Sequence, residues 1–265
     1  MKLVRVLLFV VLCAVLLAVA GPVAAGIHLL PPALTIGALT SAGTLLLTIV
    51  FVRWEKISLR DVGGAFGSRS LQRFVFGFVI GACLIAAYVM TLAFAGHVRF
   101  ARSANVGIGT IAISFVIYLL LACREELAFR GFPLRRLDAA YGMWAAQIVV
   151  AFLFAIEHVA GGATWPQAFL GPAVGSLLFG MAAIATEGLA VPIGIHAAWN
   201  LGDWIQGGKD STGLWNQLIP PEFASRAAIA GRAGYFIIFL GAAAAFWWWN
   251  RRTRLRIGHA VARSC

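Results

Sequence analysis

Residues 106–137 read VGIGTIAISFVIYLLLACREELAFRGFPLRRL, a long apolar run that ends in a cluster of charged side chains. A helix needs about 20 apolar residues to cross the ~30 Å hydrocarbon core of a bilayer, and this run supplies them. Charged groups within such a helix are unfavourable unless they face protein or a water-filled cavity. The run therefore predicts a membrane-spanning helix with a polar site near its end, kinked near Pro133.

Similar apolar runs fill most of the chain. Of its 265 residues, 61% are hydrophobic and only 12% are charged, whereas about a quarter are charged in a soluble domain. We therefore predict an all-α polytopic membrane bundle of about eight transmembrane helices. Besides 106–137, the predicted spans are residues 3–23, 33–52, 74–95, 142–160, 166–185, 189–205 and 227–249.

The balance of charge is strongly basic, with 21 Lys and Arg against 10 Asp and Glu. The cations lie mostly between the apolar runs, which is typical of a topology signal and not of a nucleic-acid interface. We expect both termini to be cytoplasmic, in a cell (inner) membrane, with most cations at the same side. The cations left on the opposite side are Arg99, Arg102, Lys209, Arg226 and Arg232.

No second domain is needed to explain the chain. We predict N-terminal helices and a basic cytoplasmic loop over 1–104, a helical core that contains the polar site over 105–205, and a loop, last helix and basic tail over 206–265. The first run also has features of a cleavable signal peptide, including Ala18-Val19-Ala20 before Gly21. Its length favours an uncleaved helix.

The charges at the end of the 106–137 run have a helical spacing. Glu126 and Arg130 are separated by four residues with the acid first, the favourable order for an ion pair. This pair could simply neutralise itself. Glu125 points about 100° away and has no such local partner, so it is a candidate general base.

Two further polar motifs interrupt later apolar runs. His158 lies near the end of one run, where a lone histidine is more often structural than catalytic. His196 and Asn200 lie four residues apart on one face of another helix. Lipid would not accept that face, so it is expected to line protein or a cavity.

Taken in order, these motifs resemble the family of type II CAAX prenyl endopeptidases and bacteriocin-processing enzymes, also called the CPBP or abortive-infection family. The resemblance covers residues 105–205. Its pattern is met by Glu125-Glu126-x-x-x-Arg130, Phe154-x-x-x-His158 and His196-x-x-x-Asn200. Glu157 departs from the family, which usually has a small or apolar residue there. It is expected either to perturb His158 or to face a neighbouring helix.

The resemblance implies an intramembrane endopeptidase acting on a peptide or lipidated protein, such as one with a prenylated CAAX-type tail. Glu125 and His158 would activate a water, while His196 and Asn200 would stabilise the oxyanion. Glu126 and Arg130 would maintain the geometry of their helix.

A zinc ion held by Glu125, His158 and His196 is the alternative to a metal-independent site. Asn200 argues against zinc, because an amide is a poor zinc ligand and a good oxyanion donor. No cofactor is therefore favoured.

Two other functions are compatible with the same residues. Intramembrane Glu and His side chains can form the proton relay of a transporter, although the chain lacks evident inverted repeats. A non-proteolytic immunity or partner-binding protein of the same family is the second alternative. The complete set of motifs favours the protease.

Overall fold

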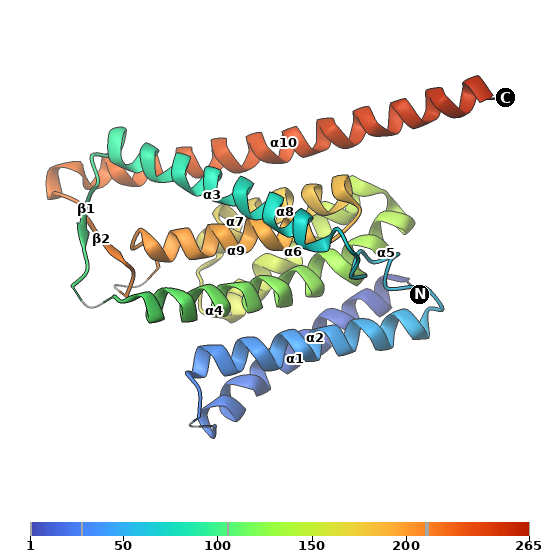
Figure 1. Cartoon of the computed structure of the whole chain (residues 1–265), viewed down its shortest axis with the longest axis horizontal. Coiled ribbons are helices and arrows are strands. Elements are labelled where there is room, and N and C mark those ends of the chain that lie inside the picture. Colours follow the sequence, from blue (N-terminus) through green and yellow to red (C-terminus); the bar gives the residue numbers. More distant parts are fainter. Residues whose placement is uncertain (1, 28, 105, 210–211, 265) are drawn as a thin grey trace.

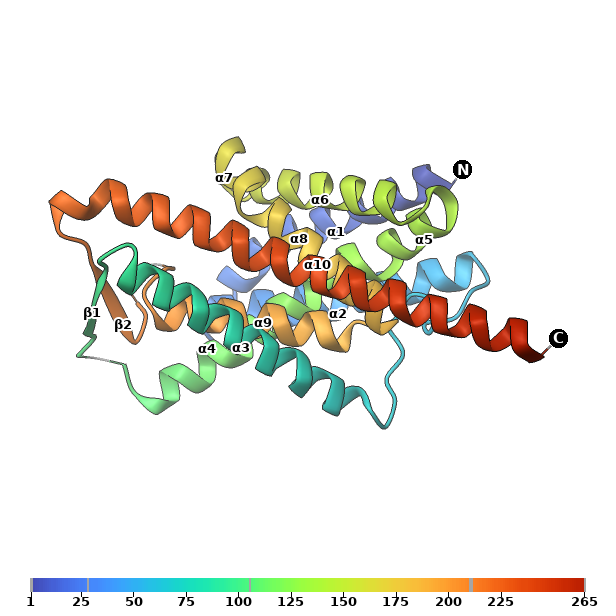
Figure 2. The same ribbon diagram turned by 90° about the horizontal axis from the view of Figure 1, so that it is seen from above.

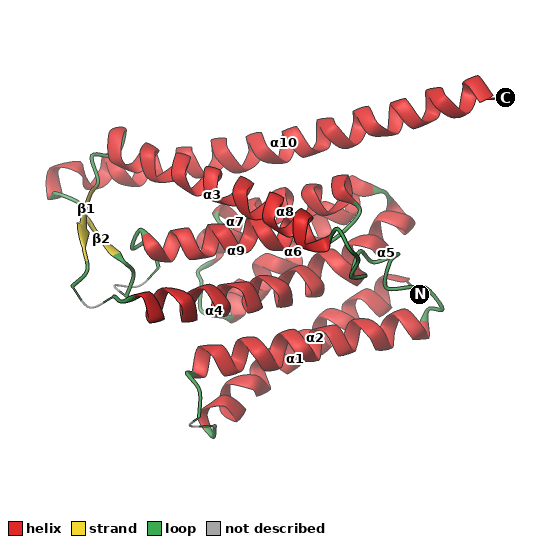
Figure 3. Ribbon diagram, in the orientation of Figure 1, coloured by secondary structure: helices red, strands yellow, loops and turns green. Residues whose placement is uncertain are grey.

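The computed structural model describes residues 2–27, 29–104, 106–209 and 212–264, and it is built almost entirely from helices (Figures 1 and 3). The predicted all-α fold is confirmed. The helices are α1 (Lys2–Ala25), α2 (Pro32–Trp54), α3 (Ser70–Phe94), α4 (Ile108–Glu126), α5 (Phe132–Tyr141), α6 (Met143–Ala160), α7 (Trp165–Leu170), α8 (Pro172–Thr186), α9 (Ala190–Ile205) and α10 (Ala224–Ser264).

Among the described residues, seven helical segments are long and apolar enough to cross a membrane, which indicates an integral membrane protein. The sequence predicted about eight. The difference is α9, which has 16 residues and is therefore about 24 Å long, short of a full span. It nevertheless runs through the bundle, packed against α3, α4 and α8 (Figure 1).

The helix predicted over 106–137 continues to Tyr141 but changes direction on the way. A π-helical turn, Leu127–Gly131, joins α4 to α5. The break falls at Gly131, whose φ of −72° and ψ of −112° lie outside the helical region. Pro133 follows in the first turn of α5. The N–H groups of a first turn have no partner within the helix, so the missing N–H of proline costs no hydrogen bond there. The predicted bend near Pro133 is therefore present, two residues earlier.

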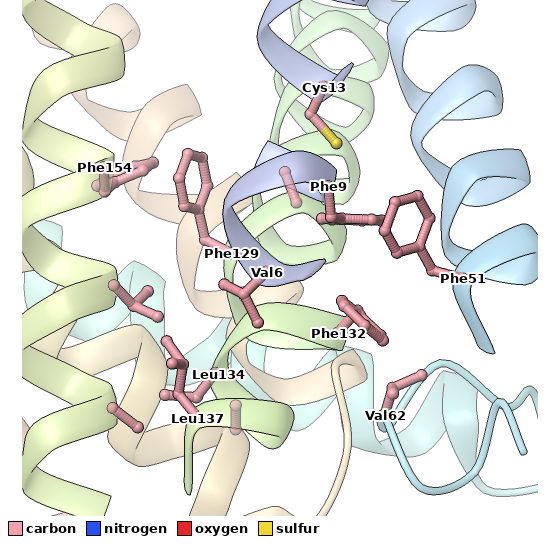
Figure 4. Close-up of a cluster of buried hydrophobic side chains, with 14 of the residues drawn as sticks. Val6, Phe9, Cys13, Phe51, Val62, Phe129, Phe132, Leu134, Leu137 and Phe154 are labelled. Carbon is pink, nitrogen blue, oxygen red and sulfur yellow. The ribbon is translucent and has the colours of Figure 1, made fainter. Parts of the chain in front are cut away.

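Helix α1 is part of the hydrophobic core (Figure 4). Val6, Phe9 and Cys13 are buried in it. The ring of Phe9 lies 5.1 Å from that of Phe51 on α2 and 5.3 Å from that of Phe132 on α5. The first apolar run thus contributes side chains that its neighbours need for packing.

Glycines bring α3 and α9 into close contact. A Cβ at Gly77 of α3 would lie 2.2 Å from the carbonyl oxygen of Val191, and one at Gly194 of α9 would lie 2.3 Å from that of Phe74. Gly81 makes a similar approach to Ile195. Small residues at such spacing allow two membrane helices to pack backbone to backbone. The contact fixes the position of α9, which carries His196.

A short two-stranded ribbon closes one end of the bundle. Strands β1 (Arg99–Arg102) and β2 (Trp215–Leu218) pair in antiparallel register. They connect the α3–α4 loop to the segment before α10, and the sequence patterns did not predict them. Both termini and α5 lie at the opposite end (Figures 1 and 2).

Candidate active site

Helices α4 and α9 bring the first and third motifs into direct contact at His196. Its Nδ1 donates a hydrogen bond to Oε1 of Glu126 at 2.8 Å. Its Nε2 lies 3.5 Å from Oε2 of Glu125. The imidazole also stacks on Phe179 of α8, with ring centroids 4.3 Å apart. One buried histidine is therefore held between the two glutamates.

Glu125 has a cationic partner, contrary to the sequence prediction. Nη2 of Arg124 donates to Oε1 of Glu125 at 2.8 Å. Arg124 had been counted among the cytoplasmic cations, but only 6% of its side chain is exposed. Side chains of adjacent helical residues diverge by about 100°, yet the long arginine side chain folds back far enough to reach its neighbour.

Glu157 faces α4 and is paired there. Its Oε1 lies 2.8 Å from Nη1 of Arg124, so one guanidinium bridges Glu125 and Glu157. The sequence left two expectations for Glu157, to perturb His158 or to face a neighbouring helix. The structure shows the contact with a neighbouring helix. Arg124 and Glu157 thus form a matched pair beside the candidate base.

His158, in the last turn of α6, has a defined hydrogen bond. Its Nδ1 lies 2.9 Å from the carbonyl oxygen of Phe154. A carbonyl oxygen only accepts, so Nδ1 carries the hydrogen and Nε2 of the neutral ring is free to accept one. The hydrogen bond of Nδ1 to the backbone is typical of a structural histidine, but it also leaves Nε2 available to accept a hydrogen bond from a water or substrate.

Arg130 makes the predicted ion pair within an aromatic enclosure. Its side chain is fully buried, and Nε lies 3.5 Å from Oε2 of Glu126. The guanidinium carbon lies 4.4 Å from the ring centroid of Phe154 and 5.4 Å from that of Phe179. Aromatic faces attract a cation, and this attraction is stronger where water is excluded.

A cavity of about 630 Å³ adjoins these residues, and His158, His196 and Asn200 are on its wall. Glu125 lies behind His196 and not on the wall itself. In the part of the chain that the structure describes, no side chain or backbone group hydrogen-bonds the amide of Asn200, so both of its hydrogens are free. The cavity wall therefore carries both a hydrogen-bond acceptor and hydrogen-bond donors.

Residues 107–202 match a family model described as Type II CAAX prenyl endopeptidase Rce1-like. We call this matched segment, residues 107–202, the Rce1-like domain. The match begins just before α4 and ends within α9, so it includes all three motifs. A comparison with curated proteins found no match.

The three residues considered for zinc are not grouped as metal ligands in the structure. Nδ1 of His158 donates to a backbone carbonyl and Nδ1 of His196 to Glu126, which leaves Nε2 of each ring for other partners. Among the described residues, no three His, Cys, Asp or Glu side chains are placed to hold a metal.

Sequence reasoning missed two residues of the Rce1-like site. Arg124 bridges two acids, and Phe179 supports the ring of His196. A signal for Arg124 was present, because a charge in an apolar helix requires a partner and Glu157 was the unassigned acid. Phe179 gave no signal, since an aromatic residue in an apolar helix is ordinary.

Proposed function

We propose that the Rce1-like domain is an intramembrane endopeptidase that hydrolyses a peptide bond of a membrane-associated substrate. One observation carries the proposal: His158, His196 and Asn200 share the wall of one cavity, and Nε2 of His196 lies 3.5 Å from Glu125. The family match supports the protease class.

Glu125 is the proposed general base. Its carboxylate takes a proton from a water, and the hydroxyl oxygen attacks the peptide carbonyl carbon. His158 orients that water through Nε2. The carboxylic acid so formed then gives its proton to the leaving amine, which restores Glu125 when the C–N bond breaks. No covalent intermediate with the protein is required.

His196 and Asn200 are the proposed oxyanion donors. His196 can donate from Nε2 while Nδ1 donates to Glu126 only if its ring carries both hydrogens. Both ring nitrogens face carboxylates, with Nδ1 2.8 Å from Glu126 and Nε2 3.5 Å from Glu125.

Glu126 and Arg130 are proposed to position His196 without touching the substrate. Glu126 accepts from His196 and pairs with Arg130, whose aromatic enclosure fixes both. We propose a peptide or lipidated protein as substrate, and a bilayer orientation with both termini cytoplasmic.

Cleavage of a quenched fluorescent peptide by purified protein in detergent tests the function. Glu125→Gln keeps the size of the side chain and removes the base, so we expect a loss of about 10²–10⁴-fold in kcat. Glu187→Gln, an exposed acid at the end of α8, is the matched control and should cleave normally. Near-normal cleavage by Glu125→Gln would show that another group is the base.

A chelation experiment tests the proposed absence of a metal requirement. Because no three His, Cys, Asp or Glu side chains of the described residues are grouped as metal ligands, we expect exhaustive dialysis against a strong chelator to leave cleavage unchanged. Metal analysis of the purified protein provides a second readout. Activity that disappears on chelation and returns with zinc would contradict the mechanism.

A further inference from the structure

Helix α10 gives a scale for depth in the membrane. Arg232 and Arg251 are charged residues that bracket its apolar stretch. At 1.5 Å per residue they are about 29 Å apart, which matches the ~30 Å hydrocarbon core. These two arginines therefore mark the two interfaces, Arg251 at the end that holds both termini (Figures 1 and 2).

The catalytic residues lie at different depths between these interfaces. His196 is about 10 Å along α9 from Leu189, whose N–H donates a hydrogen bond to Gly63 in the segment between α2 and α3. His158 lies nearer the Arg232 end, because it is in the last turn of α6, far from the turn at Gly142.

The cavity reaches the molecular surface at the same end. Gln167 at the start of α7, Lys209 after α9 and Arg232 also line it. Gln167 and Arg232 are exposed. The start of α10 lies beside the β1–β2 ribbon, at the end of the bundle opposite the termini (Figure 1).

The excess of positive charge is at the other end. The segment between α2 and α3 and the helix ends beside it carry Arg53, Lys56, Arg60, Arg69 and Arg73, and α10 adds Arg251 and Arg252. Loops rich in Lys and Arg remain on the cytoplasmic side of a membrane. The mouth of the cavity thus lies across the membrane from the basic loops.

From the residues that line the mouth of the cavity and the charge of the loops, we propose that the catalytic cavity opens to the extracytoplasmic side of the membrane. The inference rests on the proposed function and narrows its substrate. The peptide enters from outside the cytoplasm, as a membrane-anchored extracytoplasmic segment and not as a cytoplasmic prenylated tail.

Labelling of single cysteines tests the side of entry. The background variant carries Cys13→Ala, Cys83→Ala, Cys123→Ala and Cys265→Ser. Arg232→Cys places a thiol at the mouth, and Ser68→Cys places a matched exposed thiol in the basic loop. In spheroplasts of an expressing bacterium, we expect an impermeant maleimide to label Arg232→Cys, and to label Ser68→Cys only after permeabilisation. The reverse pattern, or labelling of both, would overturn the proposal.

Blocking the mouth tests whether it is the substrate path. We expect purified Arg232→Cys protein to lose cleavage in detergent after reaction with a bulky maleimide, while labelled Ser68→Cys protein keeps its rate. Full cleavage by labelled Arg232→Cys protein would also overturn the proposal. Labelling does not depend on activity, so the two proposals can fail separately. If the enzyme cleaves peptide but the labelling pattern is reversed, only the proposed side of entry is wrong. If the labelling is as expected but the unmodified enzyme does not cleave, only the proposed protease activity is wrong.

Discussion

At the scale of single residues, the site is a cluster of buried charges whose members depend on one another. Arg124 joins Glu125 to Glu157, and Glu126 joins Arg130 to His196. Removing one partner of a buried ion pair leaves a charge without compensation, which costs about 3–5 kcal/mol. Substitutions within the cluster should therefore be strongly non-additive.

The bridge formed by Arg124 gives a testable case. Arg124→Gln removes the guanidinium partner of two buried carboxylates and should lower the free energy of unfolding by about 3–5 kcal/mol. Adding Glu157→Gln removes one of those carboxylates, so the double variant should be more stable than Arg124→Gln alone. Thermal unfolding in detergent measures each variant. A coupling energy below about 0.5 kcal/mol between the two sites would contradict the bridge.

Glu126 should matter for stability as well as for activity. Glu126→Gln leaves the fully buried Arg130 with only aromatic contacts, and we expect a loss of about 3–5 kcal/mol in unfolding free energy. Glu187→Gln, outside the cluster, should leave the melting temperature unchanged. An unchanged melting temperature for Glu126→Gln would mean that the aromatic enclosure alone is enough for Arg130.

At the scale of helices, the close packing of α3 on α9 sets the position of His196. Gly194→Ala would place a methyl group 2.3 Å from the carbonyl oxygen of Phe74, so the two helices must separate. We expect a lower melting temperature and a loss of cleavage. Gly241→Ala on α10 is the control, because nothing lies within 4 Å of its added Cβ. That variant should be as stable as the parent or slightly more stable. Unchanged cleavage by Gly194→Ala would show that the helix contact does not position the site.

At the scale of the whole molecule, an apolar core and ion pairs of Glu55 are among the contacts that join α1 and α2 to the rest. Glu55 accepts a hydrogen bond from Arg5 at 3.2 Å and pairs with Arg136, so α1, α2 and α5 are connected. Phe9 is fully buried against α2 and α5. The N-terminal helices therefore belong to the same folded unit as the Rce1-like domain.

A truncation of one side chain tests this unity. Phe9→Ala should destabilise the whole bundle by about 3–5 kcal/mol, as expected for a buried phenylalanine. Val19→Ala, on the exposed face of the same helix, should change stability little. On heating, the Phe9→Ala protein should lose cleavage activity at the same temperature at which it unfolds. Loss of α1 structure with an intact, active domain would instead make the N-terminal helices an independent unit.

The sequence by itself determined the class of fold and the identity of the three motifs. The thickness of a bilayer dictates the length of each apolar run. The number of membrane spans could therefore be predicted to within one before the packing of the helices was known. The pair of Glu126 and Arg130 could be predicted because their spacing is local. The bend near Pro133 was equally local, since it depends on the missing backbone N–H of proline.

Only the tertiary structure decided which charges meet. His196 contacts a glutamate 70 residues away, and Arg124 reaches an acid on another helix. The β1–β2 ribbon and the mouth of the cavity also join distant segments. A helical period shows which residues share a face, but not which helix covers that face. In a membrane, most of each helix surface is apolar, so the hydrophobic pattern alone cannot make that choice, and close packing at small residues makes it instead.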